Sequence, residues 1–182
     1  MSTLLSVDPG IRGSGAAIFI DAQLIRAGYV QNPEREGGGP QECVTMAHAI
    51  ALWVMCEHRP TELAVEIPQI YGRGGGKTKG DPNYLLPLFG VQCAIAMLLR
   101  THAKVTAYKP ADWKGSTSKP LRQDGKVEYV ITRRVKERLS ADELKCVDWT
   151  QSVKHSWDVA DAVALGLHHL GRFDRVRKFA RE

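Results

Sequence analysis

Two carboxylates, Asp8 and Glu66, stand at the ends of short apolar runs. Asp8 follows the run 4–7, Glu66 follows the run 63–65, and in each case a proline comes one or two residues later. A proline cannot continue a central β-ladder, so each carboxylate should lie where a strand ends. Taken singly, Asp8 could merely cap a turn, and Glu66 could be an exposed strand exit.

A second pair, Asp158 and Asp161, lies three residues apart in the apolar segment 156–170. This spacing places both carboxylates on one side of a helix, where like charges repel. A solvated helix face is the ordinary explanation, but the alanines at 160, 162 and 164 leave room for close approach to a sheet. His155 falls on the same side and could act as a general acid or base, orient a phosphate, or equally cap the helix start.

Together, Asp8, Glu66, Asp158 and Asp161 could converge into one acidic cluster. Such a cluster is costly unless divalent cations neutralise it, and ligands that are all oxygen suit Mg2+ or Mn2+. Two such ions about 4 Å apart would clamp the attacking and leaving oxygens of a phosphodiester, with a metal-bound water as nucleophile. The set predicts metal-dependent phosphodiester hydrolysis.

The elements that must position these residues follow from hydrophobic periodicity and turn residues. Strands are expected at 4–7, 15–20, 24–30, 62–66 and 104–108, and helices at 41–58, 84–102, 127–139 and 156–170. Shorter helices are possible at 110–114 and after Ser140 or Asp142. This order predicts an α/β fold with a mixed five-stranded sheet and helices on both faces. We expect one domain over residues 1–171 and a charged tail over 172–182.

Composition narrows the class of partner. With 182 residues and 43% hydrophobic content, the chain can bury one sizeable core, and a net charge of +5 favours a polyanionic partner. The cysteines show no C-x2-C pair, so we expect buried thiols in a reducing cytoplasm; they are Cys43, Cys56, Cys93 and Cys146. The apolar stretches are too short for bilayer spans, so no membrane partner is expected.

A glycine-rich stretch, residues 72–78, ends in Gly-Lys-Thr like a phosphate-binding loop. Such a loop follows a strand directly and opens into a helix at its Lys-Thr, whereas here Lys79-Gly80-Asp81-Pro82 intervenes. We therefore expect no nucleotide cofactor, and a basic loop that contacts DNA is the better use of these residues.

The motifs Ser6-Val7-Asp8-Pro9-Gly10, Ala64-Val65-Glu66 and His155-x-x-Asp158-x-x-Asp161-Ala162 resemble the RuvC family of Holliday junction resolvases in order and spacing. The resemblance spans residues 3–170. It implies an RNase H-like fold, a homodimer, two Mg2+ ions per active site and paired nicks on strands of like polarity in a four-way DNA junction. It gives catalytic, metal-binding roles to the four carboxylates, with His155 as a further catalytic candidate.

The same resemblance implies DNA contacts in two basic stretches. The family places a ring that wedges into the junction after Glu66; Tyr71 is the nearest aromatic, although local packing would explain it equally well. The DNA-binding candidates are Tyr71, Arg73, Lys77, Lys79, Lys114, Lys119 and Lys126. Of these, Lys114 and Lys126 are the better candidates for phosphates. An insertion near 74–79, an enlarged loop at 115–125 and a tryptophan at 157 depart from bacterial RuvC and fit a divergent, phage-type member.

Three activities remain in competition on the sequence. The first is junction resolution in DNA recombination and repair, the second is cleavage of RNA–DNA hybrids or other branched DNA, and the third is a catalytically silent nucleic-acid-binding module. The full set of carboxylates argues against the third. Two symmetric nicks need two sites related by a two-fold axis, and the apolar helix Tyr84–Leu99 could supply that interface or belong to the core.

Overall fold

A computed structural model provides the coordinates of the chain. It describes residues 1–34, 39–55, 58–68, 71–72, 78–79, 82–100, 102–114, 121–123, 126–149 and 152–174. For residues 71–72, 78–79, 82–84, 121–123 and 126–128 the description covers the backbone alone.

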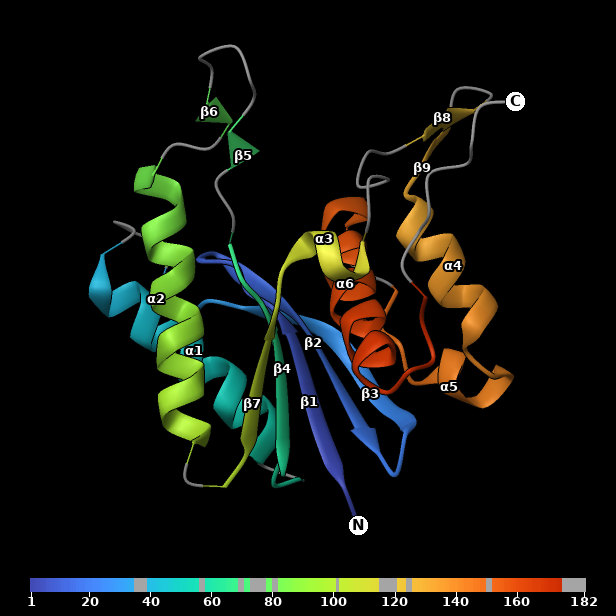
Figure 1. Ribbon diagram of the computed structural model, residues 1–182, viewed down its shortest axis with the longest axis horizontal. Coiled ribbons are helices and arrows are strands. Elements are labelled where there is room, and N and C mark those ends of the chain that lie inside the picture. Colours follow the sequence, from blue (N-terminus) through green and yellow to red (C-terminus); the bar gives the residue numbers. More distant parts are fainter. Residues whose placement is uncertain are drawn as a thin grey trace.

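A five-stranded sheet in the order β3-β2-β1-β4-β7 forms the centre of the molecule (Figure 1). The strands are β1 (Thr3–Asp8), β2 (Gly13–Ile20), β3 (Gln23–Gln31), β4 (Glu62–Glu66) and β7 (Lys104–Tyr108). The first three form an antiparallel meander, whereas β1, β4 and β7 run parallel. The predicted mixed five-stranded sheet is confirmed, and the expected strand ranges 62–66 and 104–108 match β4 and β7.

Tight turns and helical crossovers explain this topology. Asp21 and Ala22 adopt positive φ angles of 46° and 67° between β2 and β3, which is the backbone that a two-residue hairpin turn requires. The parallel strands cannot be joined so tightly, and the helices α1 (Pro40–Met55) and α2 (Pro82–Leu99) return the chain before β4 and β7.

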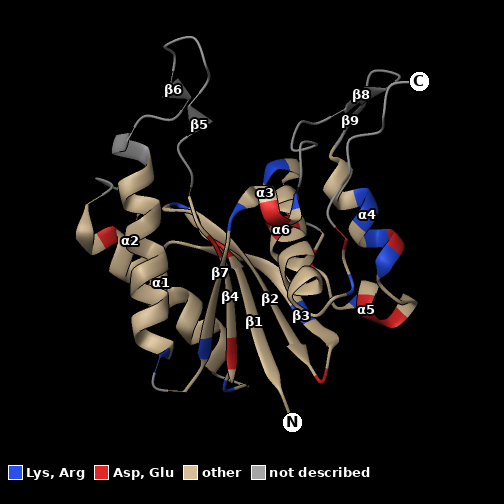
Figure 2. Ribbon diagram, viewed as in Figure 1, with Lys and Arg blue, Asp and Glu red and all other residues tan. Residues whose placement is uncertain are grey.

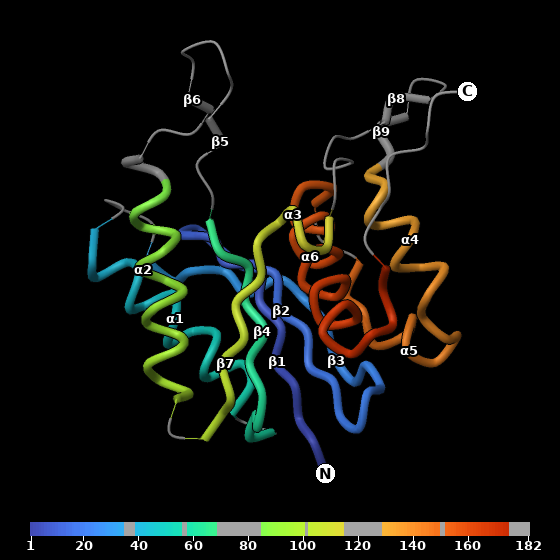
Figure 3. Tube along the Cα trace, in the orientation of Figure 1, coloured from blue at the N-terminus to red at the C-terminus, as the bar shows by residue number. Residues whose placement is uncertain are grey.

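Helices cover both faces of the sheet, as predicted. Helices α1 and α2 lie on one face, and α6 (Val153–His169), drawn orange-red in Figure 3, lies on the other face against the blue strands β1 and β2. Beside α6 are α3 (Pro110–Trp113), α4 (Val130–Arg138) and α5 (Ala141–Lys145). Each face has its own core: Leu5, Val7 and Ile50 belong to the α1–α2 side, and Leu4 and Phe19 belong to the α6 side.

Two short hairpins lie outside the central sheet and were not predicted. They pair β5 (Tyr71–Gly72) with β6 (Thr78–Lys79), and β8 (Leu121–Gln123) with β9 (Lys126–Glu128). The expected helix 127–139 is wrong at its start, because residues 126–128 form β9 and α4 begins at Val130. The alternation Lys126-Val127-Glu128-Tyr129 is typical of a strand, which explains the difference.

The remaining boundaries differ by a few residues. The helix expected at 156–170 is α6, which begins earlier because the Ser152 side chain accepts a hydrogen bond from the backbone N–H of His155. Ser140 caps α5 through the backbone N–H of Glu143, as expected. Gly171, with φ of 70°, follows the end of α6 in the left-handed conformation that glycine accommodates.

Two further expectations change. Cys43 is buried as expected, but Cys93 is exposed on α2, so the cysteines are not uniformly core thiols. Phe173 is buried against the α6 side of the sheet, so the expected tail begins as part of the packed domain. Among the described helices, none is both long enough and apolar enough to cross a bilayer.

Candidate active site

Neighbouring parallel strands bring Asp8 and Glu66 together. β1 and β4 pair in a register that sets Val7 beside Val65, so the next residue of each strand emerges at the same carboxyl edge. Open α/β sheets usually build their sites at this edge. The sequence prediction that both carboxylates lie at strand ends is therefore confirmed.

Helix α6 approaches the same edge unusually closely. A Cβ atom on Gly15 of β2 would lie 1.9 Å from the backbone carbonyl oxygen of Asp158, so only glycine permits this approach. Further along the helix, the buried Ser6 hydroxyl of β1 donates a 2.7 Å hydrogen bond to the carbonyl of Ala162. These contacts place Asp158 and Asp161 over the ends of β1 and β2.

The four carboxylates form one electrostatic unit. Burial raises the pKa of Asp8 well above its usual value; Lys114 opposes the rise, whereas the charges of Glu66, Asp161 and Asp158 add to it. Burial likewise raises the pKa of Glu66 and of Asp161. The expected convergence of strand-end and helical carboxylates thus occurs.

Asp158 lies at the rim of this cluster rather than at its centre. It is half-buried, while Asp161 is 6% exposed. Burial and the neighbouring charge of Asp161 raise the pKa of Asp158 to about 6, against the opposing effects of Lys154 and Lys114.

Lys114 occupies the space between the carboxylates. Its Nζ atom is 2.7 Å from Oδ2 of Asp161 and 3.0 Å from Oε2 of Glu66, and its side chain is buried. Burial alone would lower the pKa of Lys114, but Asp8, Asp161 and Glu66 together raise it, so the ammonium stays charged. The lysine that the sequence assigned to DNA phosphates thus lies inside the acidic cluster.

The residues fit divalent cations, although they do not form a ready-made cage. Among the described residues, no three His, Cys, Asp or Glu side chains are arranged as a metal-binding group. Yet four carboxylates face one ammonium, which also contacts Oε2 of Glu66. This excess of negative charge suits a hard cation bound by oxygen.

Two aromatic residues of the site were missed by the sequence analysis. Tyr129, directly before α4, donates from its hydroxyl to Oδ1 and Oδ2 of Asp161, at 2.7 and 2.9 Å. Trp113 of α3 is fully buried, and its ring centroid lies 4.7 Å from the Nζ atom of Lys114. Only the alternating pattern before Tyr129 could have indicated that its side chain points inward, and no comparable signal marks Trp113.

His155 does not cap its helix, and its ring lies against β3. Its ring stacks on Tyr29 of β3, with centroids 3.8 Å apart and planes inclined by 8°. The helix cap is Ser152, so the capping role is wrong. Its role in acid–base chemistry or phosphate orientation stays a prediction. The Tyr29 ring on which it stacks is near Asp158, since burial and, to a smaller extent, the charge of Asp158 raise the pKa of Tyr29.

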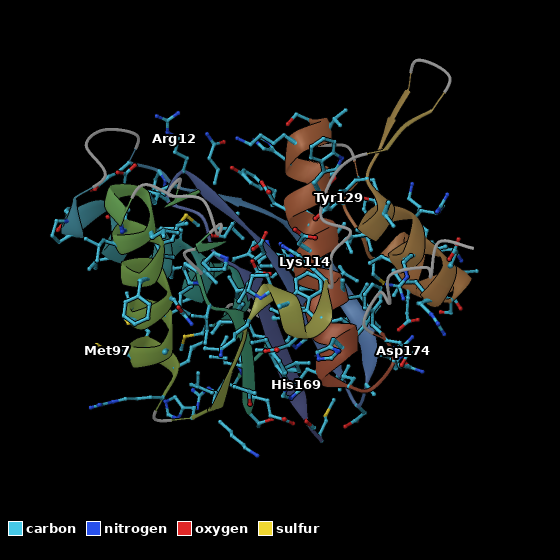
Figure 4. All side chains as sticks on the ribbon, turned by 45° about the horizontal axis from the view of Figure 1, so that its top comes forward. Arg12, Met97, Lys114, Tyr129, His169 and Asp174 are labelled. Carbon is cyan, nitrogen blue, oxygen red and sulfur yellow. The ribbon has the colours of Figure 1, made fainter. Side chains whose placement is uncertain are left out.

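The other DNA-binding candidates cannot be placed as side chains. Tyr71, Lys79 and Lys126 belong to the hairpin strands β5, β6 and β9, where the description covers the backbone alone. Arg73, Lys77 and Lys119 lie outside the described residues. Lys114 is the remaining candidate, and its side chain is described. Figure 4 shows Lys114 beside α6, together with Tyr129.

Comparison with known proteins places the fold. No protein-family model matches the chain, and no curated protein matches it by sequence. Solved structures do match. RuvC of T. thermophilus in complex with a Holliday junction substrate has a TM-score of 0.52 and 18% identity, over 97% of this chain and 100% of that one.

Two further structures agree. A Thermus thermophilus RuvC structure matches with a TM-score of 0.51 and 20% identity, over 96% of this chain and 99% of that one. The yeast mitochondrial Holliday junction resolvase Ydc2 matches with a TM-score of 0.58 and 15% identity, over 91% and 76% of the two chains. The protein therefore has the RNase H-like fold of the RuvC-type Holliday junction resolvases.

Proposed function

We propose that this protein is a divalent-metal-dependent endonuclease that resolves four-way DNA junctions by paired nicks, acting as a homodimer. The observation that carries the proposal is the convergence of four carboxylates at the carboxyl edge of β1 and β4, in a fold shared with junction resolvases. Mg2+ is the expected cation, with Mn2+ able to substitute, and two ions per site are expected.

Asp8, Glu66, Asp158 and Asp161 would hold the ions. When bound, they would activate water and neutralise charge on the scissile phosphate. The protein's own contribution is a rigid, largely buried set of oxygens: Asp8 comes from a strand end, Asp161 is fixed by neighbouring donors, and Asp158 stays at the rim where substrate can reach it.

Lys114 would serve both the empty and the occupied site. In the metal-free protein its ammonium offsets part of the carboxylate charge. Once that charge is neutralised otherwise, the ammonium is released to contact a phosphate oxygen, which is the role that the sequence assigns to it. His155, stacked on Tyr29 near Asp158, is positioned to assist in proton transfer or phosphate orientation.

Branched DNA is the proposed substrate because two features agree. Both a T. thermophilus RuvC bound to a Holliday junction and a yeast Holliday junction resolvase share this fold. The net charge is +5, and Figure 2 shows Lys and Arg concentrated along α4, on the side of the molecule that also carries α3 and α6. A positive surface beside the acidic site favours a polyanionic substrate.

The test is cleavage of an end-labelled four-way junction in Mg2+, with linear duplex and RNA–DNA hybrid as competing substrates. We expect symmetric junction nicks from the wild-type protein and none from Asp8→Asn, which removes one charge of the carboxylate cluster. Asp142→Asn is the matched control, since Asp142 is exposed on α5 and pairs with Lys145.

Each alternative has its own outcome. Cleavage of the hybrid alone would reassign the protein as a ribonuclease, and tight junction binding without cleavage in either metal would make it a silent binding module. Cleavage that survives in Asp8→Asn would overturn the assignment of the active site.

A further inference from the structure

The hydroxyl of Tyr129, a residue outside the carboxylate cluster, bonds to both carboxylate oxygens of Asp161. Its oxygen lies 2.7 Å from Oδ1 and 2.9 Å from Oδ2 of Asp161, and both residues are buried. These distances are typical of a hydroxyl that donates to a charged carboxylate. A phenol keeps its proton at neutral pH, so the Tyr129 hydroxyl is the donor and the carboxylate of Asp161 is the acceptor.

The ring that carries this hydroxyl is fixed by its surroundings. Tyr129 packs against Trp157 of α6, with ring centroids 5.3 Å apart and planes inclined by 33°. Its backbone carbonyl accepts from Arg133 in the first turn of α4. A tyrosine has only two side-chain torsions, so packing on one face and a helix start behind it leave the hydroxyl little freedom.

Two donors, Lys114 and Tyr129, therefore hold the carboxylate of Asp161. Lys114 contacts Oδ2, while Tyr129 spans both oxygens. A carboxylate offers about four acceptor sites, so these donors restrain its rotation and still leave acceptor capacity for a cation. Lys114 is the partner that an incoming cation would displace, because it carries the same charge sign. The neutral phenol has no such conflict and can stay.

We propose that Tyr129 is a positioning residue: its hydroxyl holds the carboxylate of Asp161 in the orientation that binds a cation. This inference rests on the proposed function, because it assumes that Asp161 binds a divalent cation. Without the hydroxyl, Lys114 alone would hold Asp161, and a cation that displaces Lys114 would have to reorder the carboxylate on binding. Partners that orient metal ligands commonly contribute about 10- to 100-fold to metal affinity or activity.

The experiment measures Mn2+ binding to the full-length protein without DNA, by calorimetry and by the loss of free-ion signal in electron paramagnetic resonance. We expect Tyr129→Phe, which keeps the ring against Trp157, to bind Mn2+ about 10- to 100-fold more weakly than wild type. In junction cleavage, the half-saturating Mg2+ concentration should rise by a similar factor, while the rate at saturating Mg2+ recovers toward that of wild type.

Tyr108→Phe is the matched control. It deletes a phenolic hydroxyl that bonds to Nδ1 of His169 at 2.9 Å and not to a carboxylate of the cluster, on a residue whose backbone pairs with Glu66. Its Mn2+ affinity should equal that of wild type. Thermal unfolding of the metal-free variants reports whether each protein folds, so weaker binding by a folded Tyr129→Phe protein cannot be a general loss of structure.

A second variant separates hydrogen bonding from shape. Site-specific 3-fluorotyrosine at position 129 keeps the donor, so its Mn2+ affinity should stay within a few-fold of wild type. An equally large loss with fluorotyrosine as with phenylalanine would overturn the proposal, as would unchanged or tighter binding by Tyr129→Phe. If the wild-type protein itself binds no divalent cation, the proposed function fails first, and the two failures are thus distinct.

Discussion

At the scale of single residues, the four carboxylates are unequal. Asp161 is buried, whereas Asp8 and Asp158 are each partly exposed, and the pKa of Asp158 is raised to about 6. A raised pKa means that folding disfavours the charged form of Asp158. The metal-free protein therefore stores electrostatic strain that appears as the pH rises through this range.

We predict that the metal-free protein loses stability between about pH 4 and pH 6. The sign follows from proton counting: between the unfolded pKa of 3.8 and the folded value of about 6, the folded protein binds the extra proton, so stability falls as pH rises. Discounted for partial exposure, Asp158 contributes on the order of 1–2 kcal/mol. Urea unfolding in a chelator at a series of pH values measures the effect.

Asp158→Asn is the companion variant for that measurement. Its stability should change less over the same pH interval, because this titrating group is gone. Identical pH slopes for the two proteins would show that the folded pKa of Asp158 is not raised.

The sequence predicts which carboxylates form this site better than it predicts their hydrogen-bond and ion-pair partners. All four carboxylates could be selected, because strand-end positions and the three-residue helical spacing are local properties. Lys114 was expected to face DNA, since a lysine in a basic stretch carries no local sign that three distant carboxylates will surround it. Tyr129 was missed for the same reason: its partner is 32 residues away.

At the scale of elements, the site depends on how closely α6 can lie on the sheet. Gly15 of β2 faces the backbone of Asp158, and Gly166 of α6 lies against Phe19 and Ser6. A side chain at either glycine would push the helix outward, and with it two of the four carboxylates.

We predict that Gly15→Ala destabilises the protein by about 1–3 kcal/mol or more and lowers junction cleavage, because its Cβ would lie 1.9 Å from a backbone oxygen. Gly28→Ala on neighbouring β3 is the control. There the nearest atoms to an added Cβ are 3.7 and 3.9 Å away, and alanine is favoured over glycine inside a strand. Chemical denaturation and cleavage assays compare the two proteins.

An equal response to both substitutions would show that the approach of α6 does not depend on Gly15. Normal cleavage by a destabilised Gly15→Ala protein would show that the carboxylates tolerate a shifted helix.

Element types were predictable where periodicity was strong, and boundaries were not. The five central strands and the major helices follow from local hydrophobic pattern. The two hairpins escaped because their strands are two or three residues long and lie in glycine- and lysine-rich stretches where no period can be measured. Helix α2 also begins before the expected residue 84, with Pro82 in its first turn.

At the scale of the whole molecule, one helix serves both the interior and the surface. Val91, Ile95 and Leu99 of α2 are buried in the core between the sheet and α1. Leu86, Phe89, Cys93 and Met97 follow one another at helical spacing on the outer side, where Phe89 is 52% exposed and Met97, labelled in Figure 4, is 66% exposed. The two uses that the sequence left open for this helix are thus compatible.

We predict that the proposed homodimer forms through this outer stripe. Replacing Phe89 and Met97 by aspartate should convert the dimer to a monomer, because buried charges without partners are strongly unfavourable at an apolar interface. Sedimentation velocity measures the mass. On a four-way junction, the monomer should lose the pairing of nicks on opposite arms.

Ile25→Asp on β3 is the control for added charge, since Ile25 is also exposed. The idea fails if the wild-type protein sediments as a monomer, or if the doubly substituted α2 protein remains a dimer.

The double grip on Asp161 has a consequence for chain topology. Lys114 and Tyr129 lie on either side of residues 115–128 in the sequence, and both bond to the carboxylate of Asp161. These two contacts close a noncovalent loop of the chain. Closing such a loop costs chain entropy, which the substitution Asp161→Ala would restore. That variant would lose a metal ligand and also free the base of a stretch containing Lys119 and Lys126. Its DNA affinity would then change even in a chelator, whereas Asp8 closes no such loop.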